Sequence, residues 1–401
     1  MTITLLIDLD DTLLDSHLED FLPAYFRALA AHLAHIVLTE KLLPALMAGT
    51  QKMIQNTDPG CTLQEVFEQS FYPQLSVKRE ELESEIEDFY DREFPLLGKL
   101  TKPRSDAQEF LGWAKAQGYR IAIATDPLFP RMATLHRIKW AGLDPENFAL
   151  ISTFEKFHFS KNNPAYYGEV LGQMGWPDGP IVMVGNDFNR DIYPAQLAGF
   201  ATYEISSGFP SNEIQEERNS KGNFKSLSSW IQNVAPETFA PDFHSREAQI
   251  ALMAATPASL DALLRDLDKK EWIIKSSPED WAMIEIVCHL RDSESELNQM
   301  QIQLFGNGKE PFIPRPDAAV WARQRSYLNE DPEKALAGFI SSRRQTIDML
   351  NNLPLQHWAL KARHSIFGPT NFLEVIGFMT EHDRLHIQQA WKTLRFIQGS
   401  E

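Results

Sequence analysis

The sequence predicts an α/β fold, a Rossmann-like parallel sheet with an inserted helical cap, followed by an all-α four-helix bundle. Three observations lead to this prediction. An apolar strand near the start of the chain ends in two carboxylates, Asp8 and Asp10. About a hundred residues with apolar side chains at helical spacing follow before the next apolar strand. From about residue 246 onward the strand patterns vanish and four amphipathic helices can be traced, which indicates an antiparallel bundle.

The two carboxylates indicate a site at the end of the first strand. Burying an unpaired carboxylate costs several kcal/mol, so carboxylates at the end of a buried strand usually face a metal, a cation or a reaction. In open α/β sheets, ligands bind outside the carboxyl ends of the strands. The alternative is a solvated acidic turn, which the later segments of the chain disfavour.

The segment from about residue 16 to residue 100 is predicted to be a helical cap. Residues 21–29 and 80–90 show apolar side chains at helical spacing. A helical lid of this kind closes over a site, expels water and selects the substrate. The acidic run of residues 80–88 is predicted to be a solvated helix face, and it argues against a polyanionic substrate approaching from that side.

Three later segments supply further polar groups after apolar runs. Residues 121–126 form a second apolar strand that reaches Thr125 and Asp126, and Lys161 precedes a helix that begins near Ala165. The candidate metal ligands of the third segment follow an apolar strand at residues 181–185; they are Asn186, Asp187 and, a little further on, Asp191.

These groups fit phosphoryl transfer, which needs a nucleophile in line, a cation on the non-bridging oxygens and a proton donor for the leaving group. Asp8 is the predicted nucleophile, because a carboxylate attacking phosphorus forms an acyl phosphate that water can cleave. Asp10 would protonate the leaving oxygen and then activate the water. Thr125 and Lys161 would hold the phosphoryl oxygens. Asp8 together with the pair Asn186 and Asp187 would bind a hard cation, most simply Mg²⁺.

The four segments, in this order and spacing, resemble the motifs of the haloacid dehalogenase superfamily over residues 1–234. The resemblance implies that the backbone carbonyl of Asp10 is also a metal ligand and adds Asp191 to the metal site. Asn186 departs from the family pattern, which commonly has aspartate there, so either Asn186 or Asp187 could be the ligand. Asn162 replaces a common proline. The presence of Asp10 favours a phosphatase over a dehalogenase.

A proline-containing stretch without helical spacing predicts a linker at residues 235–245, and the bundle is expected over residues 246–401. Its second helix is predicted to start at Ser277, with Pro278 at the first helical position, and carries His289. The last helix carries His382 and His386, four residues apart and therefore on one face.

Three histidines on two facing helices make a metal site with positions left open for water or substrate. The alternative is that they are hydrogen-bonded core residues or interact with Asp292 and Glu285. The metal could be Zn²⁺, Ni²⁺, iron or manganese, since imidazole suits several of these. Cys288 is expected to pack in the core.

The pattern of His289 on one helix with His382 and His386 on the last resembles the DinB-like four-helix family, over residues 246–397. The resemblance implies a divalent metal held by these three histidines, and some members are thiol-dependent transferases or isomerases. Two alternatives to a working phosphatase therefore stay open. The main chemistry could lie at the histidine metal, or the bundle could be an interaction or homodimerisation module.

The composition of the chain argues against some classes of binding partner. The 401 residues carry a formal net charge of −17, which argues against nucleic-acid binding because that needs a basic face. Two cysteines give no disulfide framework, and no apolar run approaches transmembrane length. The chain enters its first strand without a basic leader. The expectation is a cytoplasmic protein that acts on a small phosphorylated metabolite, without membrane or nucleic-acid partners.

Overall fold

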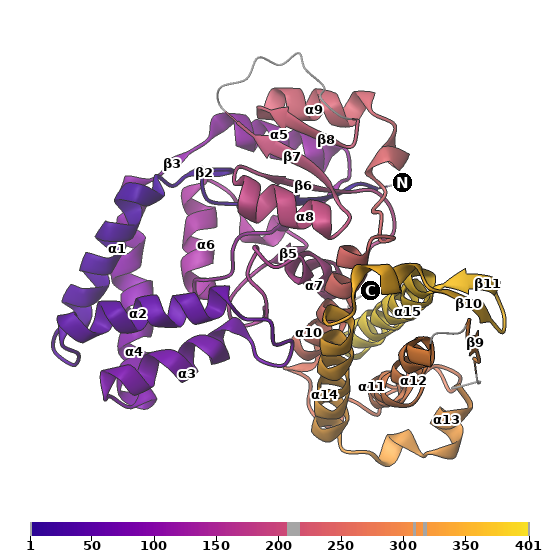
Figure 1. Cartoon of the computed structure of the whole chain (residues 1–401). Coiled ribbons are helices and arrows are strands. Elements are labelled where there is room, and N and C mark those ends of the chain that lie inside the picture. Colours follow the sequence, from indigo (N-terminus) through magenta and orange to yellow (C-terminus); the bar gives the residue numbers. More distant parts are fainter. Residues whose placement is uncertain (1, 207–216, 308–309, 316–318, 400–401) are drawn as a thin grey trace.

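The computed structural model describes residues 2–206, 217–307, 310–315 and 319–399 (Figure 1). Its first part contains a six-stranded sheet in the order β5-β4-β1-β6-β7-β8, with every neighbouring pair parallel. Helices follow in the C-terminal part, so the predicted fold class is confirmed. The strands of the sheet are β1 (Thr4–Ile7), β4 (Arg120–Ile123), β5 (Leu150–Ile151), β6 (Ile181–Gly185), β7 (Ala201–Ile205) and β8 (Asn219–Gly222).

Side chains of β1 alternate between two apolar layers, as the pleat of a strand requires. Leu5 and Ile7 pack in the core under α5, α6 and α9, whereas Leu6 packs in the core formed with α7 and α8. The sheet is therefore covered on both faces, which explains why its central strands are continuous apolar runs. The covering helices are α5 (Ser105–Ala116), α6 (Arg131–Trp140), α7 (Ala165–Gln173), α8 (Tyr193–Leu197) and α9 (Phe224–Asn233), with η3 (Pro145–Asn147) and η4 (Phe188–Ile192) between them.

A helical cap is inserted between β1 and β4 and stands beside the sheet (Figure 1). A short antiparallel pair of strands, β2 (Leu14–Asp15) and β3 (Lys102–Pro103), joins its two ends at the base. In the acidic helix of the cap only Leu82 is buried, so the run of carboxylates is a solvated face. The cap elements are α1 (Leu18–Leu33), α2 (Thr39–Ile54), α3 (Leu63–Leu75), α4 (Arg79–Asp88), η1 (Phe89–Glu93) and η2 (Phe94–Leu100).

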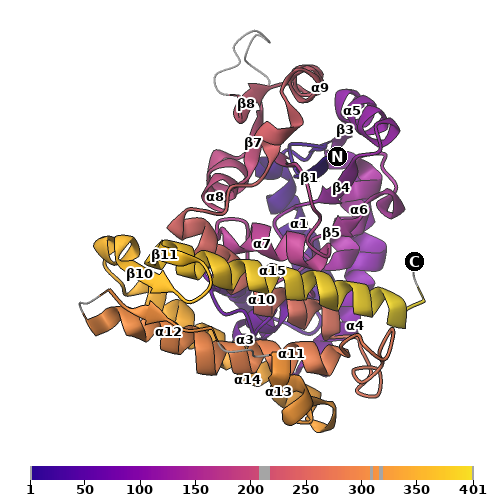
Figure 2. The ribbon, with the colours of Figure 1, turned by 90° about the vertical axis from the view of Figure 1, so that its right-hand side faces the viewer.

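The C-terminal part is built on four helices, α10, α11, α14 and α15, with shorter elements between them (Figure 2). The segment before it contains one turn of helix, η5 (Pro236–Phe239). No helix in the described part of the chain is both long enough and apolar enough to cross a membrane. The elements are α10 (Arg246–Leu264), α11 (Met283–Asp292), η6 (Ser293–Asn298), α12 (Gln299–Leu304), η7 (Phe305–Asn307), β9 (Phe312–Ile313), α13 (Ala319–Gln324), η8 (Tyr327–Asn329), α14 (Pro332–Asn351), η9 (Leu355–Ala359), β10 (Lys361–His364), β11 (Gly368–Asn371) and α15 (Phe372–Ile397).

Two expectations about the bundle are wrong. Its second helix starts at Met283 and not at Ser277, because the Ser277 hydroxyl donates to the Asp280 carboxylate and so does not cap a helix. The Glu285 carboxylate instead accepts from the backbone N–H of Ala282, 2.8 Å away, and fixes the later start. Strands are also present, since β9, β10 and β11 form a small sheet whose segments are too short for a clear alternating pattern.

A buried arginine ties the bundle helices together. Arg343 on α14 is fully buried and donates to the Glu294 carboxylate at 2.8 Å, to the Asp383 carboxylate at 3.1 Å and to the backbone oxygen of Met253 at 2.8 Å. These partners lie on η6, α15 and α10. A buried guanidinium needs several such partners, because its desolvation is otherwise uncompensated. The Nε atom of Arg343 has no hydrogen-bond partner. Because Asp383 directly follows His382, the pairing of Arg343 with Asp383 fixes the position of α15 at His382.

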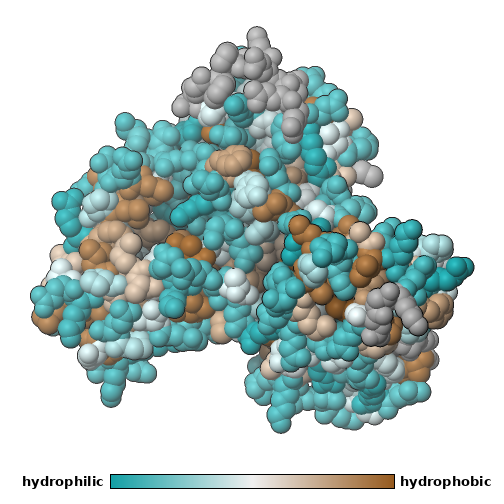
Figure 3. All heavy atoms as spheres, in the orientation of Figure 1, coloured by the Kyte–Doolittle hydropathy of each residue, from teal (hydrophilic) through white to brown (hydrophobic). Residues whose placement is uncertain are grey.

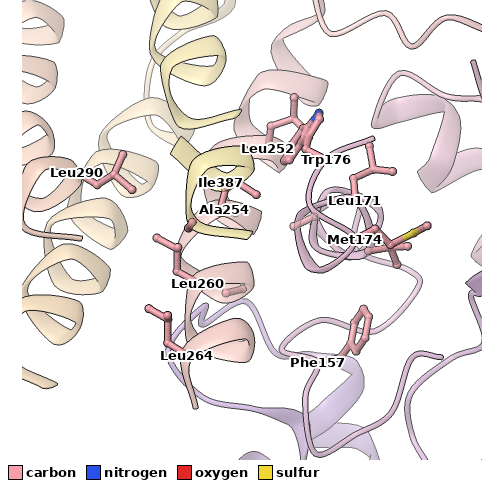
Figure 4. Close-up of a cluster of buried hydrophobic side chains, with 14 of the residues drawn as sticks. Phe157, Leu171, Met174, Trp176, Leu252, Ala254, Leu260, Leu264, Leu290 and Ile387 are labelled. Carbon is pink, nitrogen blue, oxygen red and sulfur yellow. The ribbon is translucent and has the colours of Figure 1, made fainter. Parts of the chain in front are cut away.

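The two parts of the chain share a core where α7 packs against α10 (Figures 2 and 4). One apolar cluster holds Leu171 and Trp176 from the first part and Leu252, Leu260 and Ile387 from the bundle. Glycines on α7 allow the close approach. A Cβ added at residue 172 would lie 2.0 Å from the Ser259 hydroxyl oxygen. The helices therefore touch at a distance that a larger side chain at this glycine would prevent.

A buried histidine bridges the same interface. His158 has no exposed surface, and its Nδ1 lies 2.8 Å from the Glu169 carboxylate on α7 while its Nε2 lies 3.1 Å from the Asp261 carboxylate on α10. Arg265 also donates to Asp261, and Gln173 donates to Glu169. Burial alone would lower the pKa of His158, but the two carboxylates outweigh it and raise the pKa from 6.5 to about 9. The imidazolium is thus the stable form in the folded protein.

Stability should therefore depend on pH through His158. Its contribution is fully present below pH 6.5 and is lost as the pH rises through about 9. A shift of this size corresponds to about 3 kcal/mol in the free energy of unfolding. Urea unfolding of the wild type and of His158→Gln, at pH 6 and pH 10, should give a stability difference that shrinks by this order at the higher pH. His244→Gln, at a fully accessible histidine, is the control and should follow the wild type. An unchanged difference between the two pH values would contradict the charged bridge.

Candidate functional sites

The first site lies at the carboxyl ends of β1 and β6. Asp8 directly follows β1, and its backbone N–H still bonds to the carbonyl of Val184, 2.9 Å away, so the strand pairing places its carboxylate. Only 6% of Asp8 is exposed. The Lys161 ammonium lies 2.6 Å from one carboxylate oxygen of Asp8, and the Thr12 hydroxyl lies 2.9 Å from the other. Residues 8 and 161, far apart in the sequence, are thus brought into direct contact.

The charges at this site influence one another strongly. Burial raises the pKa of Asp8 to about 7; Asp191 adds to the rise and Lys161 opposes it. Burial would lower the pKa of Lys161, but the carboxylates of Asp191 and Asp8 raise it overall. Lys161 therefore stays charged. An additional cation beside Asp8 would favour the ionised carboxylate.

Asn186 and Asp187 have different surroundings. The Thr12 hydroxyl that faces Asp8 also lies 2.9 Å from the side-chain oxygen of Asn186. Asp187 instead accepts from the backbone N–H groups of Asn189, at 2.8 Å, and of Arg190, at 3.2 Å, and so caps η4. Of the two side chains, only Asn186 shares a partner with Asp8.

Asp191 is buried and lies behind the site. It forms an ion pair with Lys161, and its other oxygen accepts from the backbone N–H of Asp187 at 2.9 Å. Gly185 makes room for it, since a Cβ there would lie 2.3 Å from the Asp191 carboxyl carbon. Asp191 thus orients Lys161 and the loop that follows β6.

Thr125 is buried at the end of β4, next to the first strand. Its backbone oxygen accepts from the Ser152 hydroxyl at 2.7 Å and from the Tyr166 hydroxyl at 2.8 Å, which fixes the loop. The neighbouring Asp126 accepts from the backbone N–H of Lys161 at 3.2 Å. The loop after β4 therefore supports the lysine that contacts Asp8.

Asp10 has a partner that the sequence interpretation missed. One of its oxygens forms an ion pair with the buried Arg137 on α6, and the other accepts from the Ser16 hydroxyl at 2.7 Å. The guanidinium lies 4.6 Å from the ring centre of Phe129. The sequence contained an indication that Arg137 has an anionic partner, because Arg137 falls on the buried stripe of α6 together with Ala133 and Ile138. An arginine on an apolar stripe needs an anionic partner, and here that partner is the partly buried Asp10.

The second site lies inside the bundle. His289 on α11 faces His382 and His386 on α15, and one ligand atom from each of the three lies within 4.8 Å of the others. The Nε2 atoms of His289 and His382 are 3.0 Å apart. Asp292 and Glu285 are engaged elsewhere, by Arg325 and by Lys275, so they are not the partners that hold these rings together.

Two of the three imidazoles, those of His382 and His386, are held in the neutral form by burial. Burial lowers the pKa of His382 to about 3, with His386 contributing to the decrease, and burial also lowers the pKa of His386. The Nδ1 of His386 lies 2.9 Å from the side-chain oxygen of Gln389, so Nδ1 carries the proton and the lone pair of Nε2 faces the other rings. Trp281 stacks on His386 with ring centres 5.7 Å apart. Neutral, oriented imidazoles are what a transition metal requires.

The histidines line a cavity of about 580 Å³. Trp281 and Phe378 contribute apolar surface to its wall, and Asn298, Gln301 and Arg315 contribute polar groups. A metal at this place would keep a side open toward this space. Cys288 is fully buried next to His289 and packs in the core, as expected.

These features define a two-part protein, in which an α/β part holds a buried carboxylate–lysine centre and a helical bundle holds three clustered histidines. Residues 4–199 match the family model described as haloacid dehalogenase-like hydrolase, and residues 252–390 match the DinB superfamily model. Both resemblances predicted from the motifs are confirmed. The chain is therefore similar to a haloacid dehalogenase-like hydrolase in its first part and to the DinB superfamily in its bundle.

Solved structures resemble each part separately. A phosphatase of the first family from Thermococcus onnurineus is 19% identical, with a TM-score of 0.37, over 59% of this chain and 100% of that one. A 2-haloacid dehalogenase from Pseudomonas syringae is 18% identical, with a TM-score of 0.43, over the same shares. YfiT from Bacillus subtilis, a four-helix bundle, is 18% identical, with a TM-score of 0.36, over 40% of this chain and 92% of that one. No curated protein matches the chain.

Proposed function

We propose that the first part is a Mg²⁺-dependent phosphatase that acts on a small phosphomonoester through a phosphorylated Asp8. The observation that carries this proposal is the buried carboxylate of Asp8 with the Lys161 ammonium 2.6 Å away. A carboxylate held against a permanent cation, at the edge of the sheet where ligands bind, suits attack on an anionic phosphoryl group. The haloacid dehalogenase-like match supports a hydrolase at this place.

Each of the site residues has its own role in the two steps of the proposed reaction. A carboxylate oxygen of Asp8 attacks phosphorus, the bond from phosphorus to the ester oxygen breaks, and Asp10 donates its proton to the leaving oxygen. Asp10 then takes a proton from the water that cleaves the acyl phosphate, which restores Asp8 and releases inorganic phosphate. Lys161 and Thr125 hold the phosphoryl oxygens. Arg137 fixes the position of Asp10.

The oxygen donors at the site suit a hard cation. Asp8 and Asn186 present oxygens to one Thr12 hydroxyl, whereas Asp187 caps η4, so we assign the ligand role to Asn186. The backbone carbonyl of Asp10 would complete the set of cation ligands. Asp191 would support the site indirectly, by orienting Lys161. Mg²⁺ bound there would neutralise charge on the phosphoryl oxygens. An amide in place of a carboxylate should weaken cation binding, because one formal charge is lost.

The test is phosphate release from a panel of phosphorylated metabolites by the purified full-length protein, with Mg²⁺ and with a chelator. We expect turnover that requires Mg²⁺. The Mg²⁺ concentration that saturates the rate should be higher than is typical for a site made of carboxylates alone. Turnover that persists in excess chelator would contradict the metal role. Asn186→Asp is the informative variant, since it should lower the Mg²⁺ concentration needed for half-maximal rate.

We further propose that His289, His382 and His386 bind a divalent transition metal such as Zn²⁺ or Ni²⁺. The neutral rings and the cavity beside them support this assignment. That cavity also favours a second candidate function, in which a thiol-dependent transfer or isomerisation takes place in the bundle. In that case the first part would be auxiliary.

A further inference from the structure

The cap and the core enclose a cavity of about 690 Å³ that reaches the reaction residues. Asp10 and Arg137 are part of its wall, together with side chains from α1, α2, α3, α4 and α6. A space of this size accommodates a ligand as large as a typical drug molecule. Brown, hydrophobic side chains gather in the hollow over the cap helices at the left of Figure 3.

Most of the wall is apolar. Its side chains include Leu22, Phe26, Met47, Phe67, Phe129 and Met132. Met47 and Met132 remain 52% and 38% exposed, although apolar side chains of this size normally lie in the core. A ligand with a large apolar group would cover them and gain the free energy of removing that surface from water.

Several polar groups in the wall are already paired within the protein, whereas one buried carboxylate oxygen of Glu155 has no hydrogen-bond partner. The hydroxyls of Tyr25 and Tyr90 bond to each other at 2.8 Å, and Arg137 is paired with Asp10. Arg190 is paired with the Asp126 carboxylate at 3.1 Å. A sugar phosphate that entered this space would exchange hydroxyl–water hydrogen bonds for apolar contacts, which is unfavourable.

The charge on the cap side of the wall disfavours a second anionic group there. Glu68, Glu83 and Glu87 line the cavity on the cap side. Arg79 pairs with the first two of these, and it lies on the surface. A second phosphate or carboxylate that reached the cap side would therefore approach carboxylates, whereas Arg131 and Arg190, which also line the cavity, lie outside the cap.

We propose that the substrate is the phosphate monoester of a large apolar alcohol or phenol, with its phosphate at Asp8 and its organic group in the cap cavity. The proposal rests on the phosphatase function and names its substrate class. It differs from the expectation of a generic small metabolite, because it excludes polyhydroxylated and doubly charged esters as preferred substrates.

The test is a series of n-alkyl phosphates from methyl to octyl, below their micelle concentrations, with glycerol phosphate and glucose 6-phosphate for comparison. We expect kcat/KM to rise up to about fourfold per methylene along the series, since each buried methylene contributes about 0.8 kcal/mol. Methyl phosphate and the two polar esters should be the poorest substrates. A flat series, or a preference for glycerol phosphate, would overturn the substrate class while leaving the phosphatase function intact.

A matched pair of variants on α2 tests the cavity itself. Met47→Gln places an amide in the wall and should lower kcat/KM for octyl phosphate about fivefold with little change for methyl phosphate. Leu43→Gln alters a residue that is 42% exposed on the same helix but lies outside the wall, and it should match the wild type. Equal behaviour of the two variants would contradict the proposal.

A binding measurement tests the apolar site independently of the proposed phosphatase activity. Octylphosphonate, which cannot be hydrolysed by the proposed route, should bind the Mg²⁺-loaded protein at least a hundredfold more tightly than methylphosphonate in calorimetry. Such binding without turnover of any alkyl phosphate would refute the phosphatase function and retain the apolar site. Equal binding of the two phosphonates would overturn the apolar site.

Discussion

Asp8→Asn is expected to reduce phosphate release by roughly a thousandfold or more, because the variant lacks the oxygen that attacks phosphorus. Asparagine has nearly the same shape, so the contacts with Thr12 and Lys161 can persist and the fold should be kept. The measurement is the steady-state rate on the best substrate of the panel, with acid-quench trapping of the phosphorylated protein. The wild type should give a trapped phosphoenzyme and the variant should not.

Asp15→Asn is the matched control for this result. Asp15 lies in the same segment of the chain, is 43% exposed and sits 3.9 Å from its nearest cationic partner, Arg104. Its replacement removes the same charge without touching the site, and the rate should stay at the wild-type level. Wild-type turnover by Asp8→Asn would mean that another group attacks phosphorus.

The His382→Ala/His386→Ala double variant is expected to lose the metal of the bundle. Two of three nitrogen ligands are removed, and a single remaining imidazole does not hold a divalent ion against dialysis. Elemental analysis should find a stoichiometric transition metal in the wild type and only a trace in the variant. Phosphatase activity should persist, because Asp8 lies in the other part of the chain.

His364→Ala is the control for metal loss. His364 lines the same cavity but lies outside the three-histidine group, and its Nδ1 accepts from the backbone N–H groups of Ile366 and Phe367, each at 3.2 Å. It should retain the metal. Unchanged metal in the double variant would remove the histidine site and, with it, the transferase alternative.

Local signals explain what the sequence could predict. The strands before Asp8 and Asn186 are unbroken apolar runs that end in polar residues, and both properties are visible in a few neighbouring residues. The histidine pair at positions 382 and 386 is likewise a spacing on one helix. Because parallel strands end at one edge of a sheet, their order also indicated that residues 8 and 186 would be close.

Partners from distant segments explain what the sequence could not predict. Arg137 is recognisable as an unusual arginine on an apolar stripe, but its pairing with Asp10 depends on how α6 packs beside the first loop. The choice between Asn186 and Asp187 depends on the turn into η4. The start of α11 was misplaced because Ser277 and Pro278 form a plausible cap in isolation, whereas the Glu285 carboxylate decides the boundary.

The packing of α7 on α10 has a consequence for how the protein comes apart. Because one continuous core and the His158 bridge span both parts, neither part can unfold without exposing apolar surface of the other. The whole chain should melt in a single cooperative transition. If the chain were cut within residues 235–245, the two fragments should remain associated. A variant that loosens the bundle would then lower the amount of folded first part as well, so damage to one centre would remove both.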